Sequence, residues 1–129
     1  MRLILVSAAF VLAAHASAQA EDAAAGERTF AQCRACHQVG DAAKNAVGPV
    51  LNGLFGRTAG KVEGYTYSQA NQSSGLVWDE TTFREYIRDP KAKIPGTKMI
   101  YAGLKDERRI ADLIAYLHQF DHAPLKTAP

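Results

Sequence analysis

Three helical stretches, joined by long segments without a regular period, predict an all-α fold for this chain of 129 residues. Residues 21–36 are rich in strong helix formers, residues 79–89 place apolar side chains at helical spacing, and residues 106–120 carry an apolar stripe. The segments between them are rich in glycine and proline. With 47% hydrophobic and 22% charged residues, the composition suits one small domain with its own core.

The first twenty residues differ from the rest and are typical of a secretory signal peptide. Arg2 gives a positive start, residues 3–14 form an apolar run, and residues 18–20 are a small-residue cleavage signal. The run is too short to span a membrane, so an uncleaved anchor is the weaker alternative. We expect cleavage after Ala20, which leaves 129 − 20 = 109 residues, 21–129, as a single domain without a membrane span.

The first predicted helix, residues 21–36, contains a glycine on the same face as an aromatic residue. Asp22 is suited to cap the helix or to lie in its first turn, and Gly26 and Phe30 lie four residues apart. A glycine inside a helix costs about 1 kcal/mol relative to alanine. We therefore expect a second helix to cross closely at Gly26, the alternative being a tolerated surface glycine.

Residues 38–61 predict a long ordered loop. Glycine and proline recur through it, and apolar side chains stand between them: Val47, Val50, Leu51, Leu54 and Phe55. A loop of this length without its own secondary structure is usually either functional or disordered. Its apolar content argues against disorder and indicates that the loop covers an apolar surface.

Two further helices follow this loop. The first is a short additional helix for which the segment from Ser68 is a candidate, with Gly75 ending it. Asp79 is a good N-cap for the next helix, which Pro90 stops. The apolar face of that second helix consists of Phe83, Tyr86 and Ile87.

The last part of the chain combines a loop and an amphipathic helix. Residues 91–103 show no helical period. The helix over residues 106–120 begins with acidic residues, which favour its positive end. Its apolar stripe is formed by Ile110, Leu113, Ile114 and Leu117.

The pentapeptide Cys33-Arg34-Ala35-Cys36-His37 carries the clearest chemistry. Two thiols three positions apart, followed directly by an imidazole, match the attachment site of a c-type haem. The thiols can bond to two vinyl groups of the macrocycle, and the histidine can donate a nitrogen to the iron. A disulfide is the alternative in an exported protein, but thioredoxin-like redox chemistry expects a strand–helix–strand pattern that is not found here. A structural zinc ion needs four ligands, whereas this cluster offers three.

A six-coordinate iron needs a second axial ligand, and the candidates are Met99, His118, His122 and a few lysines. A lone methionine is more often core filler. Met99, however, is the sole methionine outside the leader and lies in a loop shaped by proline and glycine, where the backbone can be held against an iron. A thioether paired with histidine raises the reduction potential of haem. We expect His118 and His122 to be exposed near the end of the last helix.

Two consequences follow for the chemistry of such a site. If protein atoms fill both axial positions, substrate cannot reach the iron, and the haem can only exchange electrons. Two buried propionates would also need partners, because a buried carboxylate must be paired or hydrogen-bonded. The donors available in the loop region are Arg57, Tyr67, Asn71 and Trp78.

The charge of the chain argues against nucleic acid as a partner. The formal net charge is +2, the loss of Arg2 gives 2 − 1 = +1, and two propionates would give 1 − 2 = −1. The overall electrostatic field is therefore weak, and no basic run is present.

Taken together, these residues resemble the class I c-type cytochromes, in particular the cytochrome c2 and mitochondrial-like cytochrome c group. The resemblance extends over nearly all of residues 21–129. The matching stretches are residues 26–37, 47–57, 64–68 with Asn71, 75–78, 94–103 and 112–117. The loop around the methionine, residues 94–103 (IPGTKMIYAG), is the most selective of them. The resemblance implies a small cytochrome c fold, with crossing N- and C-terminal helices and long loops wrapped round one covalent haem c.

The resemblance also implies roles for individual residues. These are His37 and Met99 as axial ligands of the iron, Cys33 and Cys36 as thioether anchors, the Pro49 carbonyl as acceptor for the free N–H of His37, Arg57, Tyr67, Ser68, Asn71 and Trp78 around the propionates, and Tyr86 and Thr97 on the methionine side. Gly26 and Phe30 would meet Leu113 and Tyr116 where the two terminal helices cross.

The chain departs from the family pattern in its surface lysines. Lys44, Lys91, Lys98 and Lys105 fit the lysine ring that surrounds the haem edge in animal members. Gln32 and Asp106 occupy positions that are often lysine. The segment between Phe30 and Cys33 is one residue shorter than in the mitochondrial pattern.

The implied function is that of a monomeric periplasmic electron carrier rather than an enzyme. It would shuttle single electrons from a membrane cytochrome bc complex to a cytochrome oxidase of a respiratory chain or to a photosynthetic reaction centre. A haem peroxidase or nitrogen-oxide reductase would need an open iron site with a distal acid–base group. A haem-based gas sensor would need an open site and a signalling domain. One haem motif and a filled sixth position favour the carrier.

Overall fold

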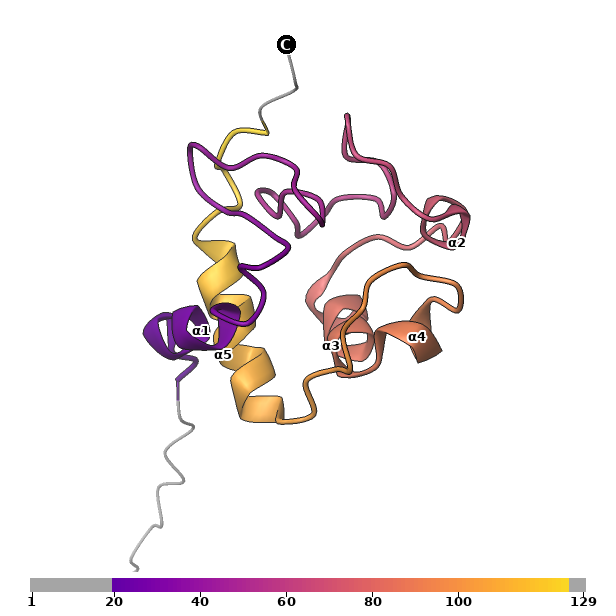
Figure 1. Ribbon diagram of the computed structural model, residues 1–129. Helices are drawn as coiled ribbons and strands as arrows, with labels where there is room; N and C mark the ends of the chain where they lie inside the picture. The colour runs from indigo at the N-terminus through magenta and orange to yellow at the C-terminus, as the bar shows by residue number, and fades with distance from the viewer. Residues whose placement is uncertain (1–19, 126–129) are drawn as a thin grey trace, which may run out of the picture.

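The computed structural model describes residues 20–125, and the secondary structure within them is helical (Figure 1). The helices of this part are α1 (Ala23–Phe30), α2 (Gln69–Gln72), α3 (Glu80–Arg88), α4 (Pro90–Lys93) and α5 (Glu107–His118). An isolated antiparallel bridge joins Thr58 and Val77. The predicted all-α fold is confirmed. No helix within residues 20–125 combines the length and the apolar character needed to cross a membrane.

The predicted leader lies outside the described residues, apart from Ala20. The signal peptide, its cleavage after Ala20 and the extent of the single domain over residues 21–129 therefore stay predictions.

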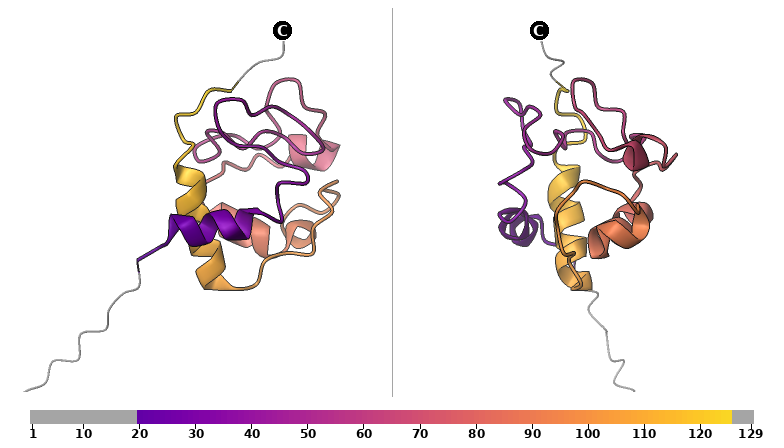
Figure 2. Two further views of the ribbon diagram at one scale, coloured as in Figure 1. Left: turned by 60° about the vertical axis from the view of Figure 1, so that its left-hand side comes forward. Right: turned by 45° about the vertical axis from the view of Figure 1, so that its right-hand side comes forward.

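Helices α1 and α5, from the two ends of the fold, cross each other (Figures 1 and 2). A Cβ atom added to Gly26 would lie 1.9 Å from the backbone oxygen of Asp112 and 2.7 Å from the Cβ of Tyr116. The rings of Phe30 and Tyr116 pack beside this point, with centroids 5.3 Å apart, and Leu113 is buried in the same cluster. The predicted close crossing is confirmed, and glycine stands there because no side chain fits.

The first helix is shorter than the predicted span of residues 21–36. It begins at Ala23, capped by the carboxylate of Asp22, and ends at Phe30. Tight turns follow, in which the Cys33 N–H donates to the Phe30 oxygen at 2.7 Å and the Cys36 N–H to the Cys33 oxygen at 3.0 Å. Hydrogen bonds to the third residue back wind the chain more tightly than an α-helix does. The haem motif therefore leaves the helix instead of extending it.

Helix α3 confirms its predicted cap and face, whereas α4 corrects the expectation that residues 91–103 lack a helix. The Asp79 carboxylate accepts the Thr82 N–H at 2.7 Å. Pro90 ends the run of α3, but it also opens α4, where the Asp89 carboxylate accepts the Ala92 N–H at 3.1 Å. Proline suits the first helical position because its missing N–H is not needed there. The predicted apolar face of α3 is buried: Phe83, Tyr86 and Ile87.

The remaining elements follow the prediction closely. Helix α5 is capped by Asp106 and ends at His118, two residues before the predicted end. Ser68 caps α2, with its hydroxyl accepting the Asn71 N–H at 3.2 Å. Residues 38–61 form neither helix nor strand, as predicted. The predicted stripe of α5 is buried: Ile110, Leu113, Ile114 and Leu117.

Candidate functional site

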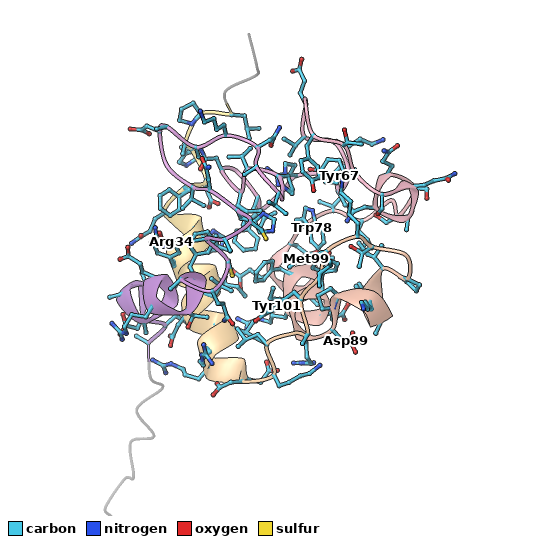
Figure 3. All side chains as sticks on the ribbon, in the orientation of Figure 1. Arg34, Tyr67, Trp78, Asp89, Met99 and Tyr101 are labelled. Atoms are coloured by element: carbon cyan, nitrogen blue, oxygen red, sulfur yellow. The ribbon has the colours of Figure 1, made fainter. Side chains whose placement is uncertain are left out.

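The loops and helices surround a cavity of about 460 Å³. Side chains from the turns after α1, the loop before α3, α3 itself and the loop after α4 reach it, and Trp78, Met99 and Tyr101 lie near the centre of the molecule in Figure 3. All twelve residues that the sequence analysis names for the site line this cavity: Cys33, Cys36, His37, Pro49, Arg57, Tyr67, Ser68, Asn71, Trp78, Tyr86, Thr97 and Met99.

Cys33 and Cys36 stand on the cavity wall as free thiols. Burial raises the pKa of Cys33 to about 11, and the neighbouring Cys36 adds to the rise. The Cys33 thiol is therefore protonated at neutral pH, which disfavours the thiolate chemistry of a redox-active cysteine pair. Among residues 20–125, no group of three or more histidine, cysteine, aspartate or glutamate side chains is placed to hold a metal ion.

The imidazole of His37 is fixed in orientation. Its Nδ1–H donates to the carbonyl oxygen of Pro49 at 2.7 Å. Burial lowers the pKa of His37 below its ordinary value, although the Pro49 contact opposes the shift. The ring is therefore neutral, and Nε2 keeps a lone pair that can coordinate a metal. Gly48 lies against the ring, because a Cβ added there would be 2.4 Å from the His37 Cε1.

Two hydroxyl groups hold Met99, one at its sulfur and one at its backbone N–H. The Tyr86 hydroxyl donates to the Met99 Sδ at 3.3 Å and lies 3.1 Å from the Thr97 Oγ1. That Oγ1 also accepts the Met99 N–H at 3.3 Å. Burial raises the pKa of Tyr86, so the phenol keeps the proton that it donates. The Trp78 ring packs edge-on against Tyr86 at 5.0 Å and restrains it.

One part of the cavity wall is polar and positively charged. Arg57 donates from Nη1 to the carbonyl oxygens of Val50 at 3.1 Å and Asn52 at 3.0 Å. Burial lowers its pKa, yet a guanidinium stays charged in proteins. The ion pairs within residues 20–125 do not include Arg57. The buried Oδ1 of Asn71 has no hydrogen-bond partner. A half-buried cation and an unsatisfied amide beside an apolar wall fit a ligand with an apolar body and an anionic end.

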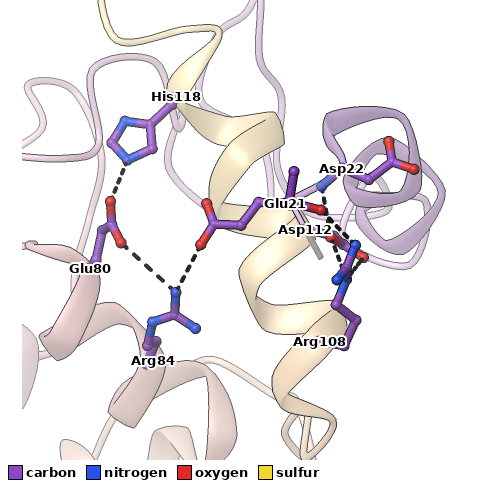
Figure 4. A network of polar contacts seen from close by, with 8 residues as sticks. Glu21, Asp22, Glu80, Arg84, Arg108, Asp112 and His118 are labelled. Carbon is purple, nitrogen blue, oxygen red and sulfur yellow. Dashed lines mark hydrogen bonds and ion pairs between the residues drawn. The ribbon is translucent and has the colours of Figure 1, made fainter. Parts of the chain in front are cut away.

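His118 and His122 do not line the cavity. His122 is exposed as predicted, but His118 is half-buried, which corrects the expectation of exposure. The His118 Nδ1 lies 2.6 Å from the Asp121 carboxylate. The His118 Nε2 lies 3.1 Å from the Glu80 carboxylate (Figure 4). Burial alone would lower the pKa of His118, but these two hydrogen bonds raise it overall. Its ring also stacks on Phe55, with centroids 4.3 Å apart.

Sequence reasoning missed much of the apolar cavity wall. Helical periodicity identifies several of these side chains as core, but it does not say whether they face protein or a ligand. The missed wall residues include Phe30, Phe83, Leu113 and Leu117.

The rim of the cavity was also not apparent from local patterns. Lys98 donates to the carbonyl oxygen of Thr66 and lies 4.6 Å from the centroid of the Tyr65 ring. Tyr65 in turn donates to the Val47 oxygen at 2.7 Å. Lys98 is the lysine that lines the cavity, and these contacts hold its side chain at the cavity rim.

Several known proteins are similar to this chain in sequence, and a solved structure is similar to it in fold. A family model described as Cytochrome c matches residues 23–121. Cytochrome c2 of Blastochloris viridis is 64% identical over 118 residues, which cover 91% of this chain and 93% of the relative. Cytochrome c-550 of Nitrobacter winogradskyi is 56% identical over 100 residues, 78% of this chain and 92% of the relative. A solved structure of cytochrome cH from Methylobacterium extorquens is 47% identical and matches with a TM-score of 0.72, over 76% of this chain and 98% of that one.

An all-α chain with two thiols and an imidazole on the wall of an apolar cavity is a haem protein of the c type. The chain belongs to the cytochrome c family, specifically to its class I members. Its cofactor is covalently bound haem c, for which Cys33 and Cys36 have the required spacing. Its role is electron transport and not enzymatic catalysis. The haem supplies an iron that changes reversibly by one electron.

Proposed function

We propose that this chain is an exported, monomeric periplasmic carrier whose haem iron is ligated by His37 and Met99. It takes single electrons from a membrane cytochrome bc complex and delivers them to a terminal cytochrome oxidase or a photosynthetic reaction centre. The observation that carries the proposal is that one cavity presents an imidazole and a thioether, each already oriented by a neighbouring group. Two protein ligands leave no axial position for a substrate.

The chain's own residues would set the properties of the site. The Pro49 carbonyl orients the His37 ring and raises the basicity of the coordinating nitrogen. The Tyr86 hydroxyl withdraws electron density from the Met99 sulfur, which favours the reduced iron. Arg57 and the Asn71 amide are placed to bind the propionates, and the apolar wall excludes water.

Replacing Met99 tests the ligand assignment. In the oxidised holoprotein, Met99→Ala should abolish the near-infrared charge-transfer band from thioether to ferric iron and lower the reduction potential. His118→Gln is the matched control, because His118 lies away from the cavity, and it should keep the band. If the band and the potential survived in Met99→Ala, the assignment would be wrong.

Rapid mixing tests the partners. Reduced holoprotein would be mixed with a cytochrome oxidase or a reaction centre across a range of ionic strength. If exposed lysines steer docking, the rate should fall as salt screens them, and Lys91→Gln should slow it more than Lys61→Gln, which changes an exposed lysine outside the predicted ring. A flat salt dependence would contradict steering by Lys44, Lys91, Lys98 and Lys105.

A further inference from the structure

The residues just before α1 are held against α5 (Figure 4). The carbonyl oxygen of Ala20 accepts a hydrogen bond from the Arg108 Nη2 at 2.7 Å. Two residues further on, the backbone N–H of Asp22 donates to the Asp112 Oδ1 at 2.8 Å. The chain is therefore fixed on both sides of the Ala20–Glu21 peptide bond before the first helix begins.

The side chain of the residue between these contacts is also held. The Glu21 Oε1 lies 3.5 Å from the Arg84 Nη2 of α3, and Arg84 pairs with Glu80 at 3.8 Å as well. Consecutive backbone nitrogens are at most about 3.6 Å apart. The Glu21 nitrogen therefore lies close to the Asp22 N–H, which donates to Asp112 of α5.

Asp112 is an unusual group to find at this place. The residue is 5% exposed, and the Arg108 Nε approaches its two carboxylate oxygens at 3.1 and 3.3 Å. A buried carboxylate needs cationic or N–H partners, and it can accept about four hydrogen bonds. It therefore has the capacity to take a further donor from the chain segment that lies on it.

We propose that Asp112 binds the α-ammonium group that cleavage after Ala20 creates on Glu21. The proposal rests on the export and cleavage proposed above. In that step an export-associated peptidase adds water across the Ala20–Glu21 bond. The carboxylate leaves with Ala20, and the nitrogen of Glu21 takes up protons to become an ammonium. Arg108 loses the Ala20 oxygen as an acceptor and retains the Asp112 carboxylate.

The charges around the new terminus decide its effect on the fold. The groups that face it are Asp112 and Arg108 of α5, Arg84 and Glu80 of α3, and the carboxylates of Glu21 and Asp22. An ammonium at the start of a helix opposes the helix dipole. The Asp112 carboxylate offsets this and gains an ion pair with the ammonium beside its hydrogen bond to the Asp22 N–H. Cleavage would therefore tighten the crossing of α1 and α5.

The test uses the holoprotein as the cell processes it, with the terminus identified by intact mass. A variant with one serine inserted between Ala20 and Glu21 moves the ammonium one residue away from Asp112. At about pH 6 the insertion should lower Tm by roughly 3 °C. In the Asp112→Asn background the insertion should have almost no effect. Glu63→Gln, which removes an exposed carboxylate elsewhere, should leave the effect of the insertion unchanged.

A second measurement does not depend on the folding of the Asp112 variant. Transamination of the natural terminus turns the amine into a ketone without lengthening the chain, and it should lower Tm by a similar amount. Both differences should vanish as the pH rises through the pKa of the amino group, which is near 8 at an ordinary terminus and is raised by a carboxylate.

Three results would overturn the proposal. The first is an inserted or transaminated protein as stable as the natural one, and the second is a loss on insertion that persists in Asp112→Asn. The third is a mass that places the cleavage elsewhere, which would also correct the predicted cleavage site. None of them touches the haem ligation, which the near-infrared band tests separately.

Discussion

Replacing Gly26 by alanine should destabilise the protein, although alanine is the better helix former. The added Cβ would lie 1.9 Å from the backbone oxygen of Asp112 and 2.7 Å from the Cβ of Tyr116. An ordinary carbon–oxygen contact is about 3.4 Å, so α1 and α5 would have to separate by roughly 1.5 Å where they cross. The obstacle is backbone, which cannot move aside as a flexible side chain can.

The expected loss combines two opposing terms. Overpacking costs about 1–3 kcal/mol, and the upper end applies here because the Phe30–Tyr116 ring contact at 5.3 Å is loosened as well. Alanine restores about 1 kcal/mol of helix propensity. The net loss is therefore about 2 kcal/mol, which corresponds to a fall in Tm of roughly 8–12 °C for a domain of this size.

Unfolding of the oxidised holoprotein in guanidinium chloride measures this loss. Trp78 is the single tryptophan of the chain and lines the cavity, so its fluorescence reports on the core. Ala24→Gly, on an exposed position of the same helix, is the control and should cost about 1 kcal/mol through propensity alone. A Gly26→Ala protein as stable as the wild type would refute the tight crossing. So would a control that loses as much as Gly26→Ala.

Two further predictions concern the methionine side of the cavity and the His118 cluster. Tyr86→Phe removes the hydrogen bond to the Met99 sulfur and should lower the reduction potential in a redox titration by about 20–60 mV, the equivalent of about 0.5–1.5 kcal/mol; an unchanged potential would argue against this role. The raised pKa of His118 means that its contribution to stability is complete below its ordinary value of 6.5 and is lost as the pH rises through the folded-state value. His118→Gln should therefore be less stable than the wild type at about pH 5, and the gap should close towards alkaline pH. A gap that widened with pH would contradict the assignment.

Helix starts could be predicted because their causes are local. Asp79 and Asp106 cap α3 and α5 through bonds to residues three positions ahead, which a short window of sequence contains. Pro90 shows where local rules are ambiguous: the same residue both ends one helix and opens another. The end of α1 at Phe30 was not predictable from propensity, because the turns of the haem motif replace the helix there.

Some parts of the site could be inferred from a short stretch of sequence, whereas others could not. The motif around His37 is local, so its chemistry could be inferred from spacing alone. No period links Arg57 to Met99, so the other residues were grouped by what a haem needs, a second ligand and propionate donors, and by the family resemblance. The contact between His118 and Glu80 spans 38 residues, and no local pattern indicates it. Its absence from the prediction explains why His118 was expected to be exposed.

The crossing of α1 and α5 also has a cost in chain entropy, because it joins two distant parts of the sequence. The hydrogen bond between Asp22 and Asp112 joins residues 90 positions apart. Closing a loop of that length costs roughly 4 kcal/mol of chain entropy before the crossing gains any packing. Most helical proteins fold fast because their contacts are local, whereas this fold depends on a contact between distant segments. The loops that line the cavity lie between Asp22 and Asp112 in the sequence. With these two residues joined, each other contact among the loops closes only a shorter loop. That one contact therefore carries a loop-closure cost that the contacts within shorter loops do not.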